Sequence, residues 1–118
     1  MKKIIIIDDE QDILRILERF LGRKFDVTVF SDPVAGLNAI KNGNYDLLLT
    51  DIMMPQLDGL SLLKKLRESN NSIKVIMMTA FDSLDKALEA HSYGAKNYIK
   101  KPFTSLEDVQ NTILAELV

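Results

Sequence analysis

Apolar residues along this chain follow two spacings that alternate with each other. Mostly unbroken apolar runs are typical of strands covered on both faces, and they predict strands at 3–7, 25–30, 46–50, 75–79 and 97–100. Between these runs, apolar residues recur at three- and four-residue intervals, as on helices that bury one side. Five successive strand–helix pairs predict an α/β fold, a doubly wound (βα)5 unit with a parallel sheet between two layers of helices.

Capping and turn residues mark where the helices begin and end. The first helix is expected to bury a stripe that includes Ile16 and Leu17 and to stop near Gly22. Ser83 is a candidate N-cap for the fourth helix. Residues 104–107, Thr-Ser-Leu-Glu, resemble a capping box and predict the start of the last helix.

Length and composition agree with one compact domain. A chain of 118 residues can bury a single core, so we expect one domain over residues 1–118. Hydrophobic residues make up 47% and charged residues 27%, which argues against disorder and against a membrane protein. The apolar stretch at 4–7 is too short for a signal peptide, so we expect a cytoplasmic location.

Charge and cysteine content exclude several classes of function. The 15 basic and 17 acidic side chains give a net charge of -2, so the domain itself is not expected to bind nucleic acid or a membrane. The chain has no cysteine, which leaves no disulfide, thiolate metal site or thiol nucleophile. This usage fits a reducing compartment.

Five polar residues fall at the ends of predicted strands: Asp8, Asp9, Asp51, Thr79 and Lys101. Taken singly, each has an ordinary explanation, such as an acid at a helix N-terminus, a turn hydroxyl or a solvated base. However, the carboxyl ends of parallel strands share one edge of the sheet, where ligands bind in open α/β folds. We therefore expect the five side chains to converge.

Converging carboxylates raise each other's pKa unless a cation is present. Hard divalent cations such as Mg²⁺ take oxygen ligands, often one or two carboxylates together with water and phosphate. A lysine opposite the acids and a hydroxyl between them would suit an oxyanion, and Asp51 becomes a candidate nucleophile that accepts a phosphoryl group. The pattern indicates metal-assisted phosphoryl chemistry.

Five motifs together resemble the receiver domain of bacterial two-component response regulators, the CheY-like family, over the whole chain. They are Asp-Asp-Glu at 8–10, LLLTDIMMP at 47–55 with Asp58-Gly59, Met-Thr-Ala at 78–80, Tyr98, and Lys-Pro-Phe at 101–103. The motifs have the order and spacing of that family. The resemblance implies a flavodoxin-like sheet with strand order 2-1-3-4-5.

The resemblance also implies roles for the converging residues. Asp51 would be phosphorylated by a sensor histidine kinase or a phosphotransfer protein. Asp9, Asp51 and the backbone carbonyl of Met53 would bind Mg²⁺, with Mn²⁺ as an alternative, while Asp8 would act mainly through a bound water. Lys101 would pair with the phosphoryl group, and the peptide bond that follows it is expected to be cis.

A conformational switch is part of the same resemblance. The hydroxyl of Thr79 would move to bind the phosphoryl group, and the ring of Tyr98 would rotate into the vacated space. The responding face would be the fourth helix, the fifth strand and the fifth helix, acting on an output domain, a downstream protein or a second copy in a phosphorylation-dependent homodimer. Such a domain catalyses its own phosphorylation and dephosphorylation and is not a conventional enzyme.

Four further residues are given less weight. Met53 and Phe81 occupy positions that, by the resemblance, border the path of the hydrolytic water, and two large apolar side chains there predict a long-lived phosphoryl group. His91, the only histidine, is expected to be structural. Lys100 is not expected to be the functional base, because the motif places that base immediately before the proline.

Three other classes of protein share parts of this pattern. A haloacid-dehalogenase-like phosphatase also uses an aspartate nucleophile, but it carries it after the first strand in a D-x-D arrangement that this chain lacks. A flavodoxin-like cofactor binder needs a phosphate loop after the first strand, where this chain has three acids. A receiver-like interaction module that is never phosphorylated usually lacks one of the acids or the lysine.

Overall fold

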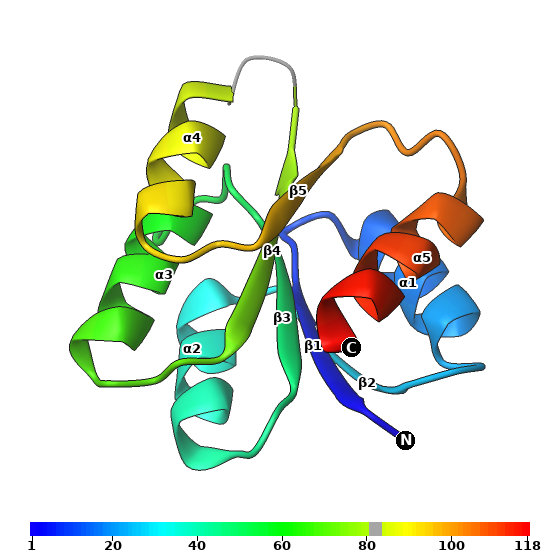
Figure 1. The fold of residues 1–118 in the computed structure, drawn as a ribbon, viewed down its shortest axis with the longest axis horizontal. Coiled ribbons are helices and arrows are strands. Elements are labelled where there is room, and N and C mark those ends of the chain that lie inside the picture. Colours follow the sequence, from blue (N-terminus) through cyan, green and yellow to red (C-terminus); the bar gives the residue numbers. More distant parts are fainter. Residues whose placement is uncertain (81–83) are drawn as a thin grey trace.

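The computed structural model describes residues 1–80 and 84–118 and contains one five-stranded sheet (Figure 1). All neighbouring strands are parallel, in the order β2-β1-β3-β4-β5. The strands are β1 (Lys3–Ile7), β2 (Asp26–Phe30), β3 (Leu47–Asp51), β4 (Lys74–Thr79) and β5 (Asn97–Lys100). The expected doubly wound fold and its strand order are confirmed.

A helix follows each strand, and the helices form two layers. Figure 1 shows α1 and α5 on one face of the sheet and α2, α3 and α4 on the other. The helices are α1 (Gln11–Leu21), α2 (Pro33–Asn42), α3 (Gly59–Glu68), α4 (Leu84–Ser92) and α5 (Leu106–Leu117). Among the described residues, none of these helices has the length and apolar character needed to cross a lipid bilayer.

The two central strands explain why the apolar runs in the sequence do not alternate with polar residues. In β1, Ile5 and Ile7 belong to the core under α2, α3 and α4, whereas Ile4 and Ile6 belong to the core under α1 and α5. All four side chains are fully buried. Because both faces of the strand are covered, every position must be apolar.

The buried stripe of α1 differs from the one expected from the sequence. Leu14, Leu17 and Leu21 are its buried residues, while Ile16 is 48% exposed. At 3.6 residues per turn, Ile16 lies about 100° around the helix from Leu17 and thus outside the stripe. The prediction that Ile16 faces the core was wrong.

Helix N-termini follow the expected capping chemistry with one shift in register. Asp32 accepts a hydrogen bond from the Val34 N–H at 3.0 Å and caps α2. The cap of α5 is Ser105, whose hydroxyl accepts from the Asp108 N–H at 3.0 Å, so the capping box begins one residue later than predicted. The cap assigned to Ser83 falls outside the described residues.

Candidate functional site

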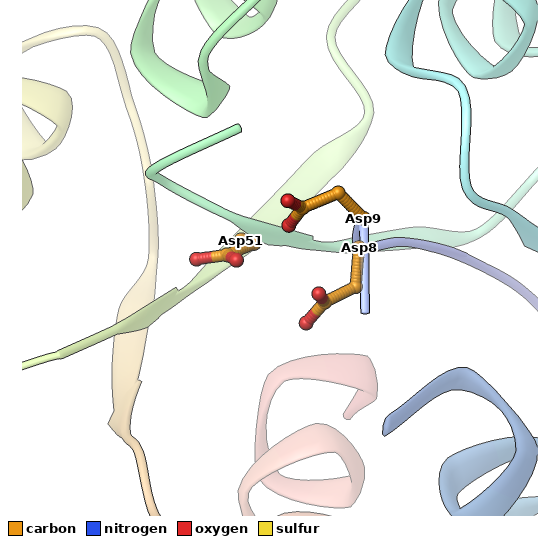
Figure 2. Close-up of side chains that lie close together, drawn as sticks. All are labelled: Asp8, Asp9 and Asp51. Carbon is orange, nitrogen blue, oxygen red and sulfur yellow. The ribbon is translucent and has the colours of Figure 1, made fainter. Parts of the chain in front are cut away.

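Three carboxylates meet at the carboxyl edge of the sheet. Asp8 and Asp9 follow β1, and Asp51 is the last residue of the adjacent strand β3. One carboxylate oxygen from each residue lies within 4.8 Å of the others, as Figure 2 illustrates. Asp8 and Asp51 are buried, whereas Asp9 is exposed, so the cluster opens to solvent on one side. The expected convergence of the acids is confirmed by their positions.

Lys101 reaches this cluster from the residue after β5. Its Nζ lies 2.6 Å from Asp8 Oδ2, 3.1 Å from Asp51 Oδ2 and 3.5 Å from Glu10 Oε1. The lysine therefore contacts the acids directly instead of standing across from them. The contact with Glu10 was missed by sequence reasoning, although this acid is the third in the Asp-Asp-Glu motif.

The backbone fixes the approach of Lys101. Its N–H donates to the Thr79 carbonyl at 2.8 Å, which ties the end of β5 to the end of β4. The Lys101–Pro102 peptide bond is cis, as expected. Lys100, one residue earlier, is the last residue of β5, and the ion pairs given above for Asp8, Glu10 and Asp51 are those of Lys101.

Burial and charge set the ionisation of the cluster. Burial raises the pKa of Asp8 and of Asp51 above the ordinary 3.8, and hydrogen bonding and charge from Lys101 oppose this only in part. The negative charge of Asp9 raises the pKa of Asp51 further. Burial would lower the pKa of Lys101, but the hydrogen bond and charge of Asp8, with those of Asp51, raise it. Lys101 thus compensates the negative charge of the carboxylates only in part, and the cluster favours an additional cation.

The backbone of Asp51 is held by the start of α3. The Gly59 N–H donates to the Ile52 carbonyl at 2.7 Å, and a Cβ on Gly59 would lie 2.3 Å from the Asp51 carbonyl oxygen. Asp58 caps the helix by accepting from the Ser61 N–H at 2.7 Å. Sequence reasoning placed Asp58-Gly59 in a motif but did not identify this support.

Of the other residues singled out from the sequence, the structure describes Thr79, Tyr98, Met53 and His91. The hydroxyl of Thr79, a buried residue, donates to the Ala80 carbonyl at 2.8 Å, and Tyr98, on β5, is 46% exposed. Met53 is 50% exposed, and its N–H donates to Asp51 Oδ1 at 3.3 Å. Phe81 lies outside the described residues. His91 is on α4, where its Nδ1 lies 3.3 Å from the Ala95 carbonyl oxygen.

The donor set suits a hard divalent cation. Asp8, Asp9 and Asp51 offer only oxygen ligands, and two of these carboxylates are buried. Mg²⁺ and Mn²⁺ favour carboxylate oxygen, whereas the soft-metal ligand cysteine is absent from the sequence. The residues present therefore fit Mg²⁺.

Fold and site together define an open α/β domain with a carboxylate cluster and a lysine at the carboxyl edge of its sheet. A family model described as the response regulator receiver domain matches residues 4–113. The chain belongs to the receiver-domain family of two-component response regulators.

Individual relatives agree with this family. YkoG of Bacillus subtilis, described as an uncharacterized transcriptional regulatory protein, is 36% identical over 97% of this chain and 50% of its own length. The DNA-binding transcriptional regulator NtrC of Escherichia coli is 40% identical over 83% of this chain and 21% of its own length. The chain thus spans half or less of the length of each of these two relatives. The solved receiver domain of Francisella response regulator 1452 has a TM-score of 0.89 and 34% identity, covering 98% of this chain and 95% of that one.

Proposed function

We propose that this domain accepts a phosphoryl group on Asp51 from a histidine kinase or a phosphotransfer protein, in a reaction that requires Mg²⁺. The observation that carries the proposal is the meeting of three carboxylates and Lys101 at one edge of the sheet. A carboxylate oxygen of Asp51 forms the bond to phosphorus while the bond from phosphorus to the donor nitrogen breaks. Hydrolysis later restores the carboxylate and releases inorganic phosphate.

Asp9, Asp51 and the backbone carbonyl of Met53 would hold Mg²⁺ directly, and Asp8 would act through a water. When bound, Mg²⁺ supplies positive charge that reduces repulsion among the carboxylates and favours a phosphoryl oxygen. The exposure of Asp9 leaves this side of the cluster open to solvent and donor. Mn²⁺ would serve as an alternative ion.

Lys101 stabilises the charge that the incoming phosphoryl group carries. Its ammonium is held beside Asp51 by the buried carboxylate of Asp8, with a distance of 2.6 Å from Nζ to Asp8 Oδ2. A cation fixed in advance needs little reorganisation when charge arrives, which is the source of its catalytic effect. Asp8 thus positions the lysine, and it would also orient a water bound to the metal.

Thr79 and Tyr98 would convert phosphorylation into a change of surface. The Thr79 hydroxyl, which donates to the Ala80 carbonyl, would turn toward a phosphoryl oxygen, and Tyr98, which is half exposed, would move inward. The face formed by α4, β5 and α5 would then act on an output domain or protein. Because YkoG and NtrC are named as transcriptional regulators, a DNA-binding output in a longer chain is the favoured arrangement. A second copy of this domain, bound through the same face in a phosphorylation-dependent homodimer, is a further partner that we propose.

The direct test is labelling with acetyl phosphate in the presence of Mg²⁺, followed by mass spectrometry. We expect one phosphoryl group per chain, no labelling of the Asp51→Asn variant, and normal labelling of Asp26→Asn, an exposed position at the start of β2. Chelation of Mg²⁺ should abolish labelling. Absence of labelling in excess Mg²⁺ would contradict the proposal, and steady turnover of phosphate esters would favour a phosphatase.

A further inference from the structure

Arg67, in the last turn of α3, binds three backbone carbonyls. Its Nε lies 2.9 Å from the Tyr93 oxygen, and its Nη1 lies 2.9 Å from the Asn71 oxygen and 3.0 Å from the Ile73 oxygen. Burial lowers the pKa of this guanidinium. Within residues 1–80 and 84–118, no carboxylate forms a salt bridge with it. Arg67 therefore links α3 to two other segments without taking part in the phosphoacceptor site.

One of these segments is the end of α4. Tyr93 follows the last residue of α4, where the carbonyls carry the negative end of the helix dipole and favour a cation. The next residue, Gly94, has a φ of 89°, a left-handed conformation that ends the helix. A Cβ at Gly94 would lie 3.4 Å from Arg67 Nη2, so the turn packs closely against the guanidinium.

Lys64, one turn before Arg67, makes a second link to the same end of α4. Its Nζ lies 3.1 Å from Glu89 Oε2 and 5.2 Å from the centre of the Tyr93 ring. The ion pair is partly exposed and contributes less than a buried bond. Together the two basic residues join α3 to the second half of α4.

The preceding part of α4 is held differently. Over residues 85–88, no side chain forms a hydrogen bond or a salt bridge with a described residue of α3. Ala87 enters the core, but as a small side chain it offers little contact area, and Leu88 is 71% exposed. Among the described residues, the polar links between α3 and α4 therefore lie at the C-terminal end of α4.

We propose that Arg67, supported by Lys64, anchors the C-terminal end of α4, so that phosphorylation swings the helix about this end. The swing rests on the proposed phosphorylation of Asp51. The movement would start at the N-terminal end of α4, because this end lies five residues after Thr79. It would reshape the groove of about 320 Å³ between α4 and β5, which Leu88, His91 and Tyr98 help to line.

The anchor is tested first in the unphosphorylated protein, by amide exchange measured with NMR. The Tyr93, Gly94 and Ala95 amides donate to carbonyls at the end of α4 and report on this turn. Arg67→Met should accelerate their exchange about tenfold, as expected for loss of a charged hydrogen bond. Lys65→Met, at an exposed position of the same helix, should leave the rates unchanged. Rates in Arg67→Met equal to those of the wild type would overturn the anchor.

Two further arms complete the test. If Arg67→Met does not fold, Glu89→Gln should accelerate the same amides about twofold, since it weakens only the exposed pair, and unchanged rates would again overturn the anchor. In wild-type protein labelled on Asp51, exchange should change at Leu88 and stay constant at Gly94. An equal change of exchange at Leu88 and Gly94 would overturn the swing. No change at either amide, with labelling verified by mass spectrometry, would also overturn it. If Asp51 cannot be labelled, both the proposed function and the swing of α4 are contradicted. The exchange rates of the unphosphorylated protein still test whether Arg67 anchors α4.

Discussion

Gly59 lies against the backbone of Asp51 so closely that a Cβ on Gly59 would be 2.3 Å from the Asp51 carbonyl oxygen. That oxygen belongs to the main chain and cannot rotate away as a side chain would. The first residue of α3 thus fixes the last residue of β3, which carries the proposed phosphoacceptor.

Replacement of Gly59 by alanine should therefore displace Asp51. We expect Gly59→Ala to lower the free energy of unfolding by about 2 kcal/mol, a usual cost of overpacking, and to reduce acetyl phosphate labelling strongly. Gly36→Ala is the matched control, because its Cβ would meet a side chain, that of Ile7, 2.4 Å away, and not the backbone of the proposed phosphoacceptor. Gly36→Ala should lower the free energy of unfolding, measured with denaturant, but should still be labelled by acetyl phosphate. Equal labelling of the two variants would contradict this role for Gly59.

Removal of the Lys101 ammonium should affect both stability and chemistry. Lys101→Met leaves the buried carboxylates of Asp8 and Asp51 without their cation, so we expect a loss of about 2–3 kcal/mol in urea unfolding without Mg²⁺. Labelling of Asp51 should fall with it. Lys100→Met, one residue earlier, is expected to label normally, and a similar loss of labelling in that variant would argue against the assignment of Lys101.

Stability in the absence of Mg²⁺ should fall as the pH rises through the titration of Asp8 and Asp51. Burial raises both pKa values above 3.8, so between 3.8 and the raised values the native state binds more protons than the unfolded chain. The free energy of unfolding then decreases with pH in that window. The raised pKa of Lys101 has a separate effect, because its contribution is present below 10.5 and is lost as the pH rises through the raised value.

Mg²⁺ should reverse the loss of stability near neutral pH. Binding to the native state alone adds about 2.7 kcal/mol at a free concentration one hundred times Kd. Thermal unfolding with and without Mg²⁺ should give a larger shift of Tm at pH 7 than at pH 4, where protons compete for the carboxylates. The Asp51→Asn variant should lose most of this shift. An equal shift in that variant would place the ion elsewhere.

Met53 provides a test of phosphoryl lifetime. Its half-exposed apolar side chain lies two residues after Asp51, the proposed phosphoacceptor, and we expect it to hinder the approach of water. Met53→Asn should accelerate loss of phosphate from labelled protein about tenfold, which corresponds to about 1.4 kcal/mol of activation free energy. Met53→Leu keeps the apolar bulk and should change the rate little. Combining Met53→Asn with Phe81→Glu should accelerate the loss further, and an unchanged rate in the double variant would end this hypothesis.

The sequence alone determined the order of the elements and the edge of the sheet at which the site lies. Unbroken apolar runs such as 47–49 require a strand covered on both faces, and alternation with helical spacing requires parallel strands. Parallel strands bring their carboxyl ends to one edge, so Asp8 and Asp51 were predictable neighbours. These inferences succeed because periodicity and strand direction are local properties of the chain.

Contacts between distant segments were decided only by the tertiary structure. Lys101 was expected opposite the acids, but its Nζ bonds directly to Asp8, 93 positions away in the sequence. The carbonyl contacts of Arg67 and the approach of Gly59 to Asp51 were likewise invisible, and Ile16 was placed on the wrong side of its helix. Such details depend on how far side chains reach and how closely backbones approach once the layers pack. The spacing of residues along the sequence determines neither of these distances.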